Sequence, residues 1–316
     1  MAEQSAFARH DIEQKLREFD THIYPLPGLE SGEALKSFAS ALCNAIDEVL
    51  IASEPLGLVT SGEVFDYDSS KFDPLLTAMW HCNLGKIEEA CWLLFLCSYF
   101  GKHPKKGWNF LRSVYSAFDG KIPWNWSQVS GRSEEFGNWL LFNQPELKKI
   151  RGLGNAYKYY TFDRNKAIEM VAQIQSYIVW VKSKVNHVKL FGDIPDYHAI
   201  EPSASFQYCY QEMSVQTALK KSVQFDYLAL IGNLGIARIQ PGHLYLNDIL
   251  LPKRGTKWLF DIKKSDKIPV SELNMRMSLL VNYLELPFGI QIVQKALGKW
   301  AVKKLSSREK IFIRRY

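Results

Sequence analysis

Several residue patterns are missing from this chain of 316 residues, and each absence removes a class of protein. Cysteine is scarce: there are five, and none belongs to a C-x-x-C pair. We therefore expect free, buried thiols in a reducing compartment, not a disulfide scaffold or a zinc ribbon. The longest apolar stretch, residues 90–100, is far too short to span a bilayer. The first residues, MAEQSAFARHDIEQ, lack the apolar core of a secretion signal. These features predict a cytoplasmic protein with no membrane partner.

Motifs for nucleotide binding and for nucleophilic catalysis are also missing. There is no G-x-x-x-x-G-K-[ST] phosphate loop, no G-x-G-x-x-G fingerprint and no nucleophile elbow. No strands alternate in series; residues 236–246, interrupted by Pro241-Gly242, predict a turn between short extended pieces. His81, Cys82 and His103 lack the spacing of a zinc finger or ribbon. We expect a mainly α protein with few short strands and with neither a metal nor a cofactor.

The charge is unevenly distributed along the chain. Lys and Arg number 39 against 33 Asp and Glu, a net charge of +6. Residues 1–70 hold 13 acids and 4 bases, a net −9, so the rest of the chain holds +15. This asymmetry predicts an acidic N-terminal helical segment, 1–70, and a basic helical domain, 71–316, whose partner is a polyanion. A chance drift toward basic composition is the alternative.

Apolar residues recur at helical spacing through most of the chain. Asp73-Pro74 predicts a helix start, and Leu84-Gly85 predicts an interruption. A buried helix is expected next, ended by Gly101. The helices expected from this pattern span residues 38–52, 86–100, 108–119, 134–142, 166–185, 205–221 and 271–286.

Two basic segments interleaved with aromatic residues suit contact with nucleic acid. In FGKHPKKGW, the bases Lys102, His103, Lys105 and Lys106 crowd a short loop that ends at Trp108. Such a loop can contact phosphates and stack on bases, although cations are also favoured at a helix C-terminus for structural reasons.

The second basic segment is KKIRGLGNAYKYY, residues 148–160. Its Gly152-x-Gly154 element predicts a hairpin whose backbone N–H groups face a phosphate, supported by Arg151 and Lys158. This element is similar to the helix-hairpin-helix of base-excision glycosylases. The alternative is a helix C-cap followed by solvated lysines.

A third segment, FDYLALIGNLGIARIQPGHLYL, places carboxylate and imidazole groups beside apolar residues. Asp226 is either a helix cap or a desolvated acid or base, and His243 is either a polar reader or a turn residue. Other candidate carboxylates are Asp193, Asp196, Glu201 and Glu212. Farther along, Lys253, Arg254 and Lys257 lie near Trp258, as expected for a surface that follows a duplex backbone or for a solvated helix face.

Three blocks together resemble clade 3 of the alpha-glutamyl/putrescinyl thymine pyrophosphorylase family. They are SKFDPLLTAMWHCNLGKIEEACWLLFLCSYFGKHPKKGW, RGLGNAYKYY and FDYLALIGNLGIARIQPGHLYL. The resemblance implies a helical DNA-glycosylase-like fold with a hairpin-type Gly-x-Gly element. It also implies action on double-stranded DNA that contains hypermodified pyrimidines. No obligatory protein partner is evident.

The resemblance implies two chemistries. One is that of the anti-phage glycosylases, a monofunctional excision of glucosylated 5-hydroxymethylcytosine that leaves an abasic site. The other is a transferase that replaces an activated 5-substituent on thymine with an amine or amino acid. A binding module for modified DNA, without catalysis, is a third alternative.

Both chemistries require the base outside the helical stack, and this requirement assigns roles to the candidates. Asp226 would stabilise the sugar cation, Asn155 would hold water or the pyrimidine O2, and His103 would contact the departing base. The expected DNA contacts are Lys102, Lys105, Lys106, Arg151, Lys158, Tyr159, Lys253, Arg254 and Lys257. The expected base and sugar pocket is formed by Trp108, Tyr160, Gln211, Glu212 and His243.

Overall fold

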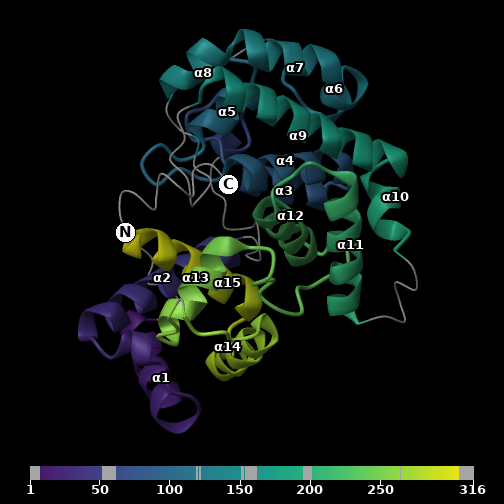
Figure 1. The fold of residues 1–316 in the computed structure, drawn as a ribbon. Coiled ribbons are helices and arrows are strands. Elements are labelled where there is room, and N and C mark those ends of the chain that lie inside the picture. The colour runs from purple at the N-terminus through teal and green to yellow at the C-terminus, as the bar shows by residue number, and fades with distance from the viewer. Residues whose placement is uncertain are drawn as a thin grey trace. The chain divides into compact units, whose positions relative to one another are not determined.

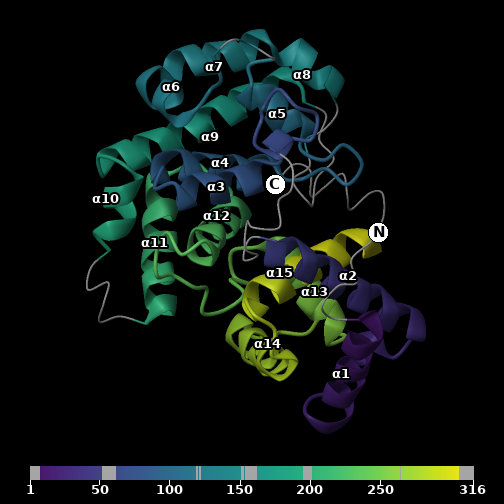
Figure 2. The same cartoon turned by 180° about the vertical axis from the view of Figure 1, so that it is seen from behind.

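A computed structural model describes residues 8–51, 62–118, 120, 122–150, 153, 162–194, 201–263 and 265–305. By contact the chain divides into two compact units, shown from opposite sides in Figures 1 and 2. One unit combines the two ends of the chain, Met1–Ser53 and Pro241–Tyr316, and the other is Glu54–Gln240. The described residues form fifteen α-helices and no sheet, so the protein is mainly α, as the sequence predicts.

The unit made from the chain ends has α15 in contact with α2, α13 and α14, while α1 packs on α2 (Figure 1). Trp300 of α15 is fully buried, and its ring lies 5.1 Å from that of Phe38. At Gly255 of α13, a Cβ would lie 2.6 Å from the backbone oxygen of Leu297, so glycine is what lets these two helices approach closely. The elements are α1 (Arg9–His22), η1 (Pro27–Leu29), α2 (Gly32–Leu50), α13 (Leu250–Leu259), α14 (Val270–Leu284) and α15 (Gly289–Lys304).

Inside this unit the acidic helix α2 packs on the basic helix α15. Glu48 of α2 forms ion pairs with Lys299 and, at 3.5 Å, with Lys295. Burial raises the pKa of Glu48, but the two lysines lower it more, so the carboxylate stays ionised. The charge-based division after residue 70 does not coincide with the compact units, because α2 shares a core with the C-terminal helices.

The second unit is built around α4. Its elements are η4 (Gly62–Val64), α3 (Pro74–Asn83), α4 (Ile87–Phe100), α5 (Asn109–Tyr115), α6 (Trp126–Gly131), α7 (Ser133–Phe142), α8 (Gln144–Ile150), α9 (Arg164–Ser183), α10 (His187–Gly192), α11 (Pro202–Gln216) and α12 (Lys221–Asn233). Nearly every residue of α4 after its first turn is buried, because α3, α5, α6, α10 and α12 all pack on it. Its Phe95 stacks on Tyr177 of α9 with ring centroids 3.7 Å apart. In Figures 1 and 2, α7 lies along α9 on the side away from α4.

Helix positions follow the sequence prediction closely, and helix ends follow it less well. Asp73 caps α3, and α4 stops at Gly101, whose φ is +69°, as expected. The helix expected at 108–119 ends at Tyr115, because Ala117 and Phe118 adopt left-handed conformations. The short extended pieces expected within 236–246 do not pair as strands: in the described residues, β-type pairing is limited to an isolated bridge between His103 and Gly107. Residues 236–246 form turns and irregular loop.

No helix in the described ranges combines the length and the hydropathy needed to cross a bilayer.

Candidate nucleic-acid interface

The loop from Lys102 to Trp108 is a tight, hydrogen-bonded turn. Backbone N–H groups of His103 and Gly107 each donate to the other residue's carbonyl, at 2.9 and 2.8 Å. The loop begins where Gly101 ends α4 and leads directly into α5. Five of the predicted interface residues therefore lie together: Lys102, His103, Lys105, Lys106 and Trp108.

One carboxylate outside the loop ties it to the rest of the unit. Asp73 Oδ2 accepts a hydrogen bond from Trp108 Nε1 at 3.0 Å and lies 3.6 Å from Lys102 Nζ. Its Oδ1 accepts from the backbone N–H groups of Leu75 and Leu76, which caps α3. Asp73 thus uses one oxygen for the helix and the other for the loop.

The imidazole of His103 braces the turn from inside. Its Nδ1 accepts hydrogen bonds from the backbone N–H groups of Lys105 and Lys106, at 3.1 and 3.0 Å. Two donors directed at Nδ1 assign the ring proton of the neutral imidazole to Nε2. His103 therefore has a local structural role that the sequence did not suggest.

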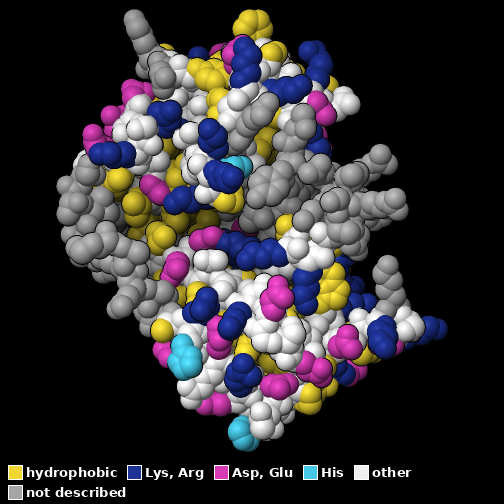
Figure 3. Space-filling view, turned by 90° about the vertical axis from the view of Figure 1, so that its left-hand side faces the viewer, with side chains coloured by type: hydrophobic (Ala, Val, Ile, Leu, Met, Phe, Trp, Pro, Cys, Tyr) yellow, Lys and Arg dark blue, Asp and Glu magenta, His cyan; other side chains and the backbone are white. Residues whose placement is uncertain are grey.

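The cations of this loop face solvent. Lys105 and Lys106 are exposed, and the side chain of Lys102 is 54% exposed while it lies over the Trp108 ring. Figure 3 shows Lys and Arg side chains recurring over the upper part of the face drawn, with a histidine among them. A braced loop with several exposed cations can contact a polyanion with little loss of conformational entropy.

The second basic segment is only partly described. Arg151, Asn155, Lys158, Tyr159 and Tyr160 lie outside the described residues. Both flanks are defined: α8 ends at Ile150, and Phe162 lies just before α9. The Phe162 ring lies 5.4 Å from Phe110, which in turn lies 5.2 Å from Phe100. Packing therefore brings Phe162, just before α9, into the same region of this unit as Phe100, where the Lys102–Trp108 loop begins.

Asp226 lies in the interior of α12. That helix begins at Lys221, so Asp226 is not its N-cap, and the capping alternative is wrong. Its neighbours Phe225 and Tyr227 are fully buried, whereas Asp226 itself is partly exposed. Asp226 is therefore a partly exposed carboxylate on a helix whose neighbouring side chains are buried.

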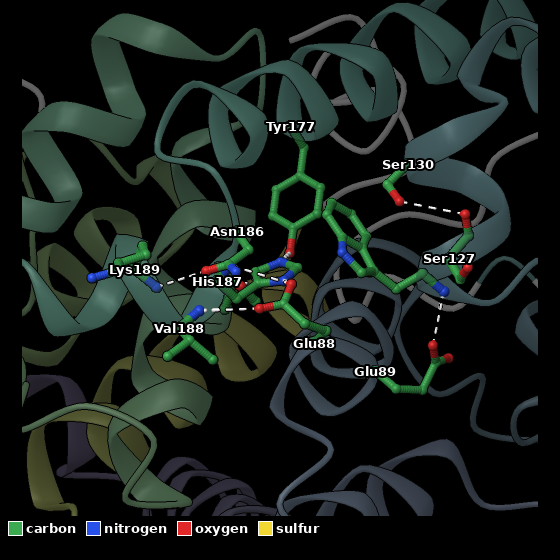
Figure 4. A network of polar contacts seen from close by, with 11 residues as sticks. Glu88, Glu89, Ser127, Ser130, Tyr177, Asn186, His187, Val188 and Lys189 are labelled. Carbon is green, nitrogen blue, oxygen red and sulfur yellow. Dashed lines mark hydrogen bonds and ion pairs between the residues drawn. The ribbon is translucent and has the colours of Figure 1, made fainter.

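A buried hydrogen-bond network sets the rotation of α12, and Figure 4 shows the part of it formed by Glu88, His187 and Tyr177. Glu88 Oε2 accepts from His187 Nδ1 at 2.7 Å, and His187 Nε2 lies 2.7 Å from the Tyr177 hydroxyl. That hydroxyl lies 3.0 Å from the hydroxyl of Tyr227. Because His187 donates to Glu88, Tyr177 must donate to His187, and Tyr227 must donate to Tyr177. Successive helical residues differ in direction by about 100°, so fixing Tyr227 inward turns Asp226 outward.

The network itself is closed to ligands. The side chains of His187, Tyr177 and Tyr227 are fully buried. Burial lowers the pKa of His187, against the opposing effect of Glu88, so its imidazole is neutral. These residues therefore hold α4, α9, α10 and α12 together and do not contact substrate.

Among the other candidate carboxylates of this unit, Asp193 and Glu201 are exposed at the end of α10 and the start of α11, and Asp196 lies outside the described residues. The two remaining candidates of this unit, Gln211 and Glu212, lie on α11. Gln211 is exposed, and Glu212 forms an ion pair with Lys184 at 3.2 Å.

Four further candidates belong to the unit made from the chain ends: His243, Lys253, Arg254 and Lys257. His243 Nδ1 accepts from the Tyr245 backbone N–H at 3.0 Å, and its ring stacks on Tyr245. Burial lowers the pKa of His243, and the opposing effect of Asp248 is smaller. The geometry therefore favours His243 as a neutral residue of the turn over a reader of the base.

Sequence reasoning missed the supporting residues. Glu88 and Glu89 begin the apolar α4, and a pair of carboxylates at that position is the signal that could have identified them. Glu88 also accepts from the backbone N–H groups of His187 and Val188, while Glu89 accepts from Tyr115 and from the Trp126 N–H. The partners lie tens of residues away, so nothing in the sequence pairs them.

Comparison with models of protein families identifies the family of this chain. The family model described as alpha-glutamyl/putrescinyl thymine pyrophosphorylase clade 3 matches residues 59–308. No curated protein and no solved structure matches. The match spans most of the chain, including the Lys102–Trp108 loop, the Gly-x-Gly segment and α12, so this chain belongs to clade 3 of the alpha-glutamyl/putrescinyl thymine pyrophosphorylase family.

Proposed function

We propose that this protein is a DNA glycosylase that extrudes a hypermodified pyrimidine from duplex DNA and hydrolyses its glycosidic bond. The observation that carries the proposal is the braced loop from Lys102 to Trp108, with exposed cations and an aromatic side chain fixed by Asp73. The family name refers to thymine bearing glutamyl or putrescinyl groups, which supports a modified pyrimidine as the target. Glucosylated 5-hydroxymethylcytosine in phage DNA is the substrate we propose, and anti-phage defence in the cytoplasm is the role.

The proposed reaction needs the base out of the stack, because C1′ is shielded inside the duplex. Extrusion costs a few kcal/mol, and phosphate contacts from Lys102, Lys105 and Lys106 would offset this cost. Trp108 would stack on the extruded base or fill the gap that it leaves. Contacts from Arg151, Lys158, Tyr159 and Tyr160, outside the described residues, would extend the same surface.

Bond cleavage would then proceed through a cationic sugar. The C1′–N1 bond breaks, its electrons leave with the base, and a water oxygen attacks C1′ while its proton passes to a carboxylate. Asp226 is the carboxylate we propose, with Asn155 holding the water. Because Nδ1 of His103 accepts from the backbone, His103 would serve as a neutral Nε2–H donor to the departing base. The proposed reaction uses water as the nucleophile and forms no Schiff base between a lysine and the sugar. The product is therefore an abasic site in an uncut strand.

The transferase is the second candidate, supported by the pyrophosphorylase in the family name. Lys102, His103 and Arg151 would then bind pyrophosphate, and the modified base would remain in the strand. A binding module without catalysis would leave the DNA unchanged.

One experiment separates these functions. The protein is incubated with glucosylated phage DNA and with unmodified DNA, and mass spectrometry follows free bases and intact nucleosides. Free modified base with abasic DNA supports excision. An aminated base still in the strand supports transfer, and unchanged DNA despite tight binding supports the binding module. Under the excision proposal, Asp226→Asn should lower the rate of base release at least about 100-fold with DNA affinity retained. Full activity of Asp226→Asn would reject Asp226 as the catalytic carboxylate.

A further inference from the structure

A second cluster of charges lies at the start of α9, directly after the Gly-x-Gly segment. Glu169 forms an ion pair with Lys166 through Oε2, and its Oε1 lies 3.7 Å from Nζ of Lys220. Lys166 belongs to the first turn of α9, and Lys220 immediately precedes α12. Two helices thus bring two ammonium groups to one carboxylate.

The carboxylate is held in place from behind. Gln173 Nε2 donates to Glu169 Oε1 at 3.1 Å, and Gln173 Oε1 accepts from the Tyr99 hydroxyl at 2.7 Å. Gln173 is buried, and because the Glu169 carboxylate can only accept, the Gln173 NH₂ group faces Glu169 and its amide oxygen accepts from Tyr99. A chance surface ion pair lacks such an ordered support.

All three charged groups are accessible to a ligand. The side chains of Lys166, Lys220 and Glu169 are 29%, 27% and 38% exposed. Burial raises the pKa of Glu169, but its hydrogen bonds and the two lysines lower it more, so it is an anion at neutral pH. At this exposure an ion pair contributes at most about 1 kcal/mol, so another anion can displace the carboxylate.

We propose that Lys166 and Lys220 form a further binding site for a backbone phosphate of DNA, which Glu169 fills as an internal counter-ion until DNA binds. Two ammonium groups that share one carboxylate are also spaced to share the two non-bridging oxygens of a phosphodiester. In the sequence the site follows the Gly-x-Gly segment, and Phe162, which lies between the two, packs on Phe110. The inference rests on DNA as the substrate of the proposed function.

Displacement of Glu169 makes the site selective. The binding free energy of an isolated anion is too small to offset the loss of the two internal ion pairs. A duplex that also binds the Lys102–Trp108 loop has a larger binding free energy, which offsets this loss. The internal carboxylate therefore lowers affinity for isolated phosphate more than affinity for duplex.

The test measures duplex binding by fluorescence anisotropy over a series of salt concentrations. Glu169→Gln should raise affinity for unmodified duplex about fivefold at low salt, because the carboxylate that competes with phosphate for both lysines, and repels it, is removed. Lys166→Gln and Lys220→Gln should each lower affinity and reduce the salt slope by about 1. Inorganic phosphate, at constant ionic strength, should compete with duplex more strongly in Glu169→Gln than in the wild type.

Glu135→Gln is the matched control, because Glu135 pairs with Arg132 in the same i,i+3 geometry elsewhere in this unit. An equal gain of duplex affinity in Glu135→Gln and Glu169→Gln would show that only the net charge matters, and this would overturn the proposal. Unchanged duplex affinity in both Lys166→Gln and Lys220→Gln would overturn it as well. If Glu169→Gln fails to fold by circular dichroism, Tyr99→Phe, which frees the Gln173 amide, should give a smaller gain of the same sign. Base release is measured separately, so loss of the glycosylase proposal leaves this binding result intact.

Discussion

Glu88 Oε2 accepts hydrogen bonds from both the ring Nδ1 and the backbone N–H of His187, at 2.7 and 3.2 Å. The acceptor comes from the first turn of α4, and the donors come from the first turn of α10, 99 residues away. One carboxylate thereby ends the His187–Tyr177–Tyr227 network and also satisfies N–H groups at the start of a second helix. The rotation of α12, and with it the direction of Asp226, depends on this contact.

Replacement of Glu88 by glutamine should therefore destabilise the protein. The partners of the two carboxylate oxygens are three N–H groups, from the His187 ring, the His187 backbone and the Val188 backbone. An amide has a single acceptor oxygen, so at least one donor would face its NH₂ group. We expect Glu88→Gln to lower the free energy of unfolding by about 1–2 kcal/mol, since the site is partly exposed. Urea denaturation measures the change, with Glu135→Gln as the control.

The neighbouring substitution Glu89→Gln should be tolerated. Burial raises the pKa of Glu89 against the opposing hydrogen bonds from Tyr115 and Trp126, so its ionised form is less favoured than that of an exposed carboxyl. A glutamine oxygen could accept from the Trp126 N–H while its NH₂ donates to the Tyr115 hydroxyl, which can act as an acceptor. We expect a change within about 0.5 kcal/mol at neutral pH by urea denaturation. A loss as large as that of Glu88→Gln would contradict this reading of the two carboxylates.

Stability should fall as the pH drops below about 6.5. The pKa of His187 is lowered by burial in the folded protein, so the unfolded chain binds a proton in this range and the folded chain does not. Because the unfolded state then holds more protons, the free energy of unfolding decreases by up to about 1.4 kcal/mol per pH unit. The pKa of Glu88 is also lowered, since the bonds from His187 and Val188 outweigh burial, and this adds a further loss below about pH 4.5.

Urea midpoints between pH 5 and 7.5 measure this dependence. His187→Gln should give a flatter profile, while His10→Gln, a change at an exposed histidine of α1, should leave it unchanged. Parallel slopes for the wild type and His187→Gln would assign the effect to other groups.

The Lys102–Trp108 loop offers a test of positioning. Asp73→Asn can keep one oxygen on the cap of α3 while its NH₂ group replaces the acceptor of Trp108 Nε1. We expect duplex affinity to fall about fivefold with little change in thermal midpoint. Equal affinity in the wild type and Asp73→Asn would show that this tie does not position the loop.

His103 can be tested with two amides of different length. In His103→Asn the side-chain oxygen lies near the position of Nδ1, so the bonds from Lys105 and Lys106 are retained. In His103→Gln the oxygen lies farther out, and the brace is lost. Anisotropy should therefore show duplex affinity retained in the asparagine variant and lowered in the glutamine variant. The reverse order would indicate that Nε2, and not the brace, sets the affinity.

Local physics made much of the fold predictable. The Asp73-Pro74 start, the apolar run of α4 after its first turn and the glycine at its end are each decided by neighbouring residues, and the structure has all three. The early end of α5 was not predictable, because the left-handed residues after Tyr115 have side chains that usually avoid that conformation.

The candidate site divides in the same way. Composition and spacing by themselves determined a helical protein with cations and aromatics gathered in the Lys102–Trp108 loop. Tertiary structure decided that α2 pairs its Glu48 with Lys295 and Lys299, that Asp73 holds Trp108, and that Glu88 meets His187. Periodicity reports which face of an element is buried, but partners distant in sequence are chosen by how whole helices pack, and no local pattern contains that information.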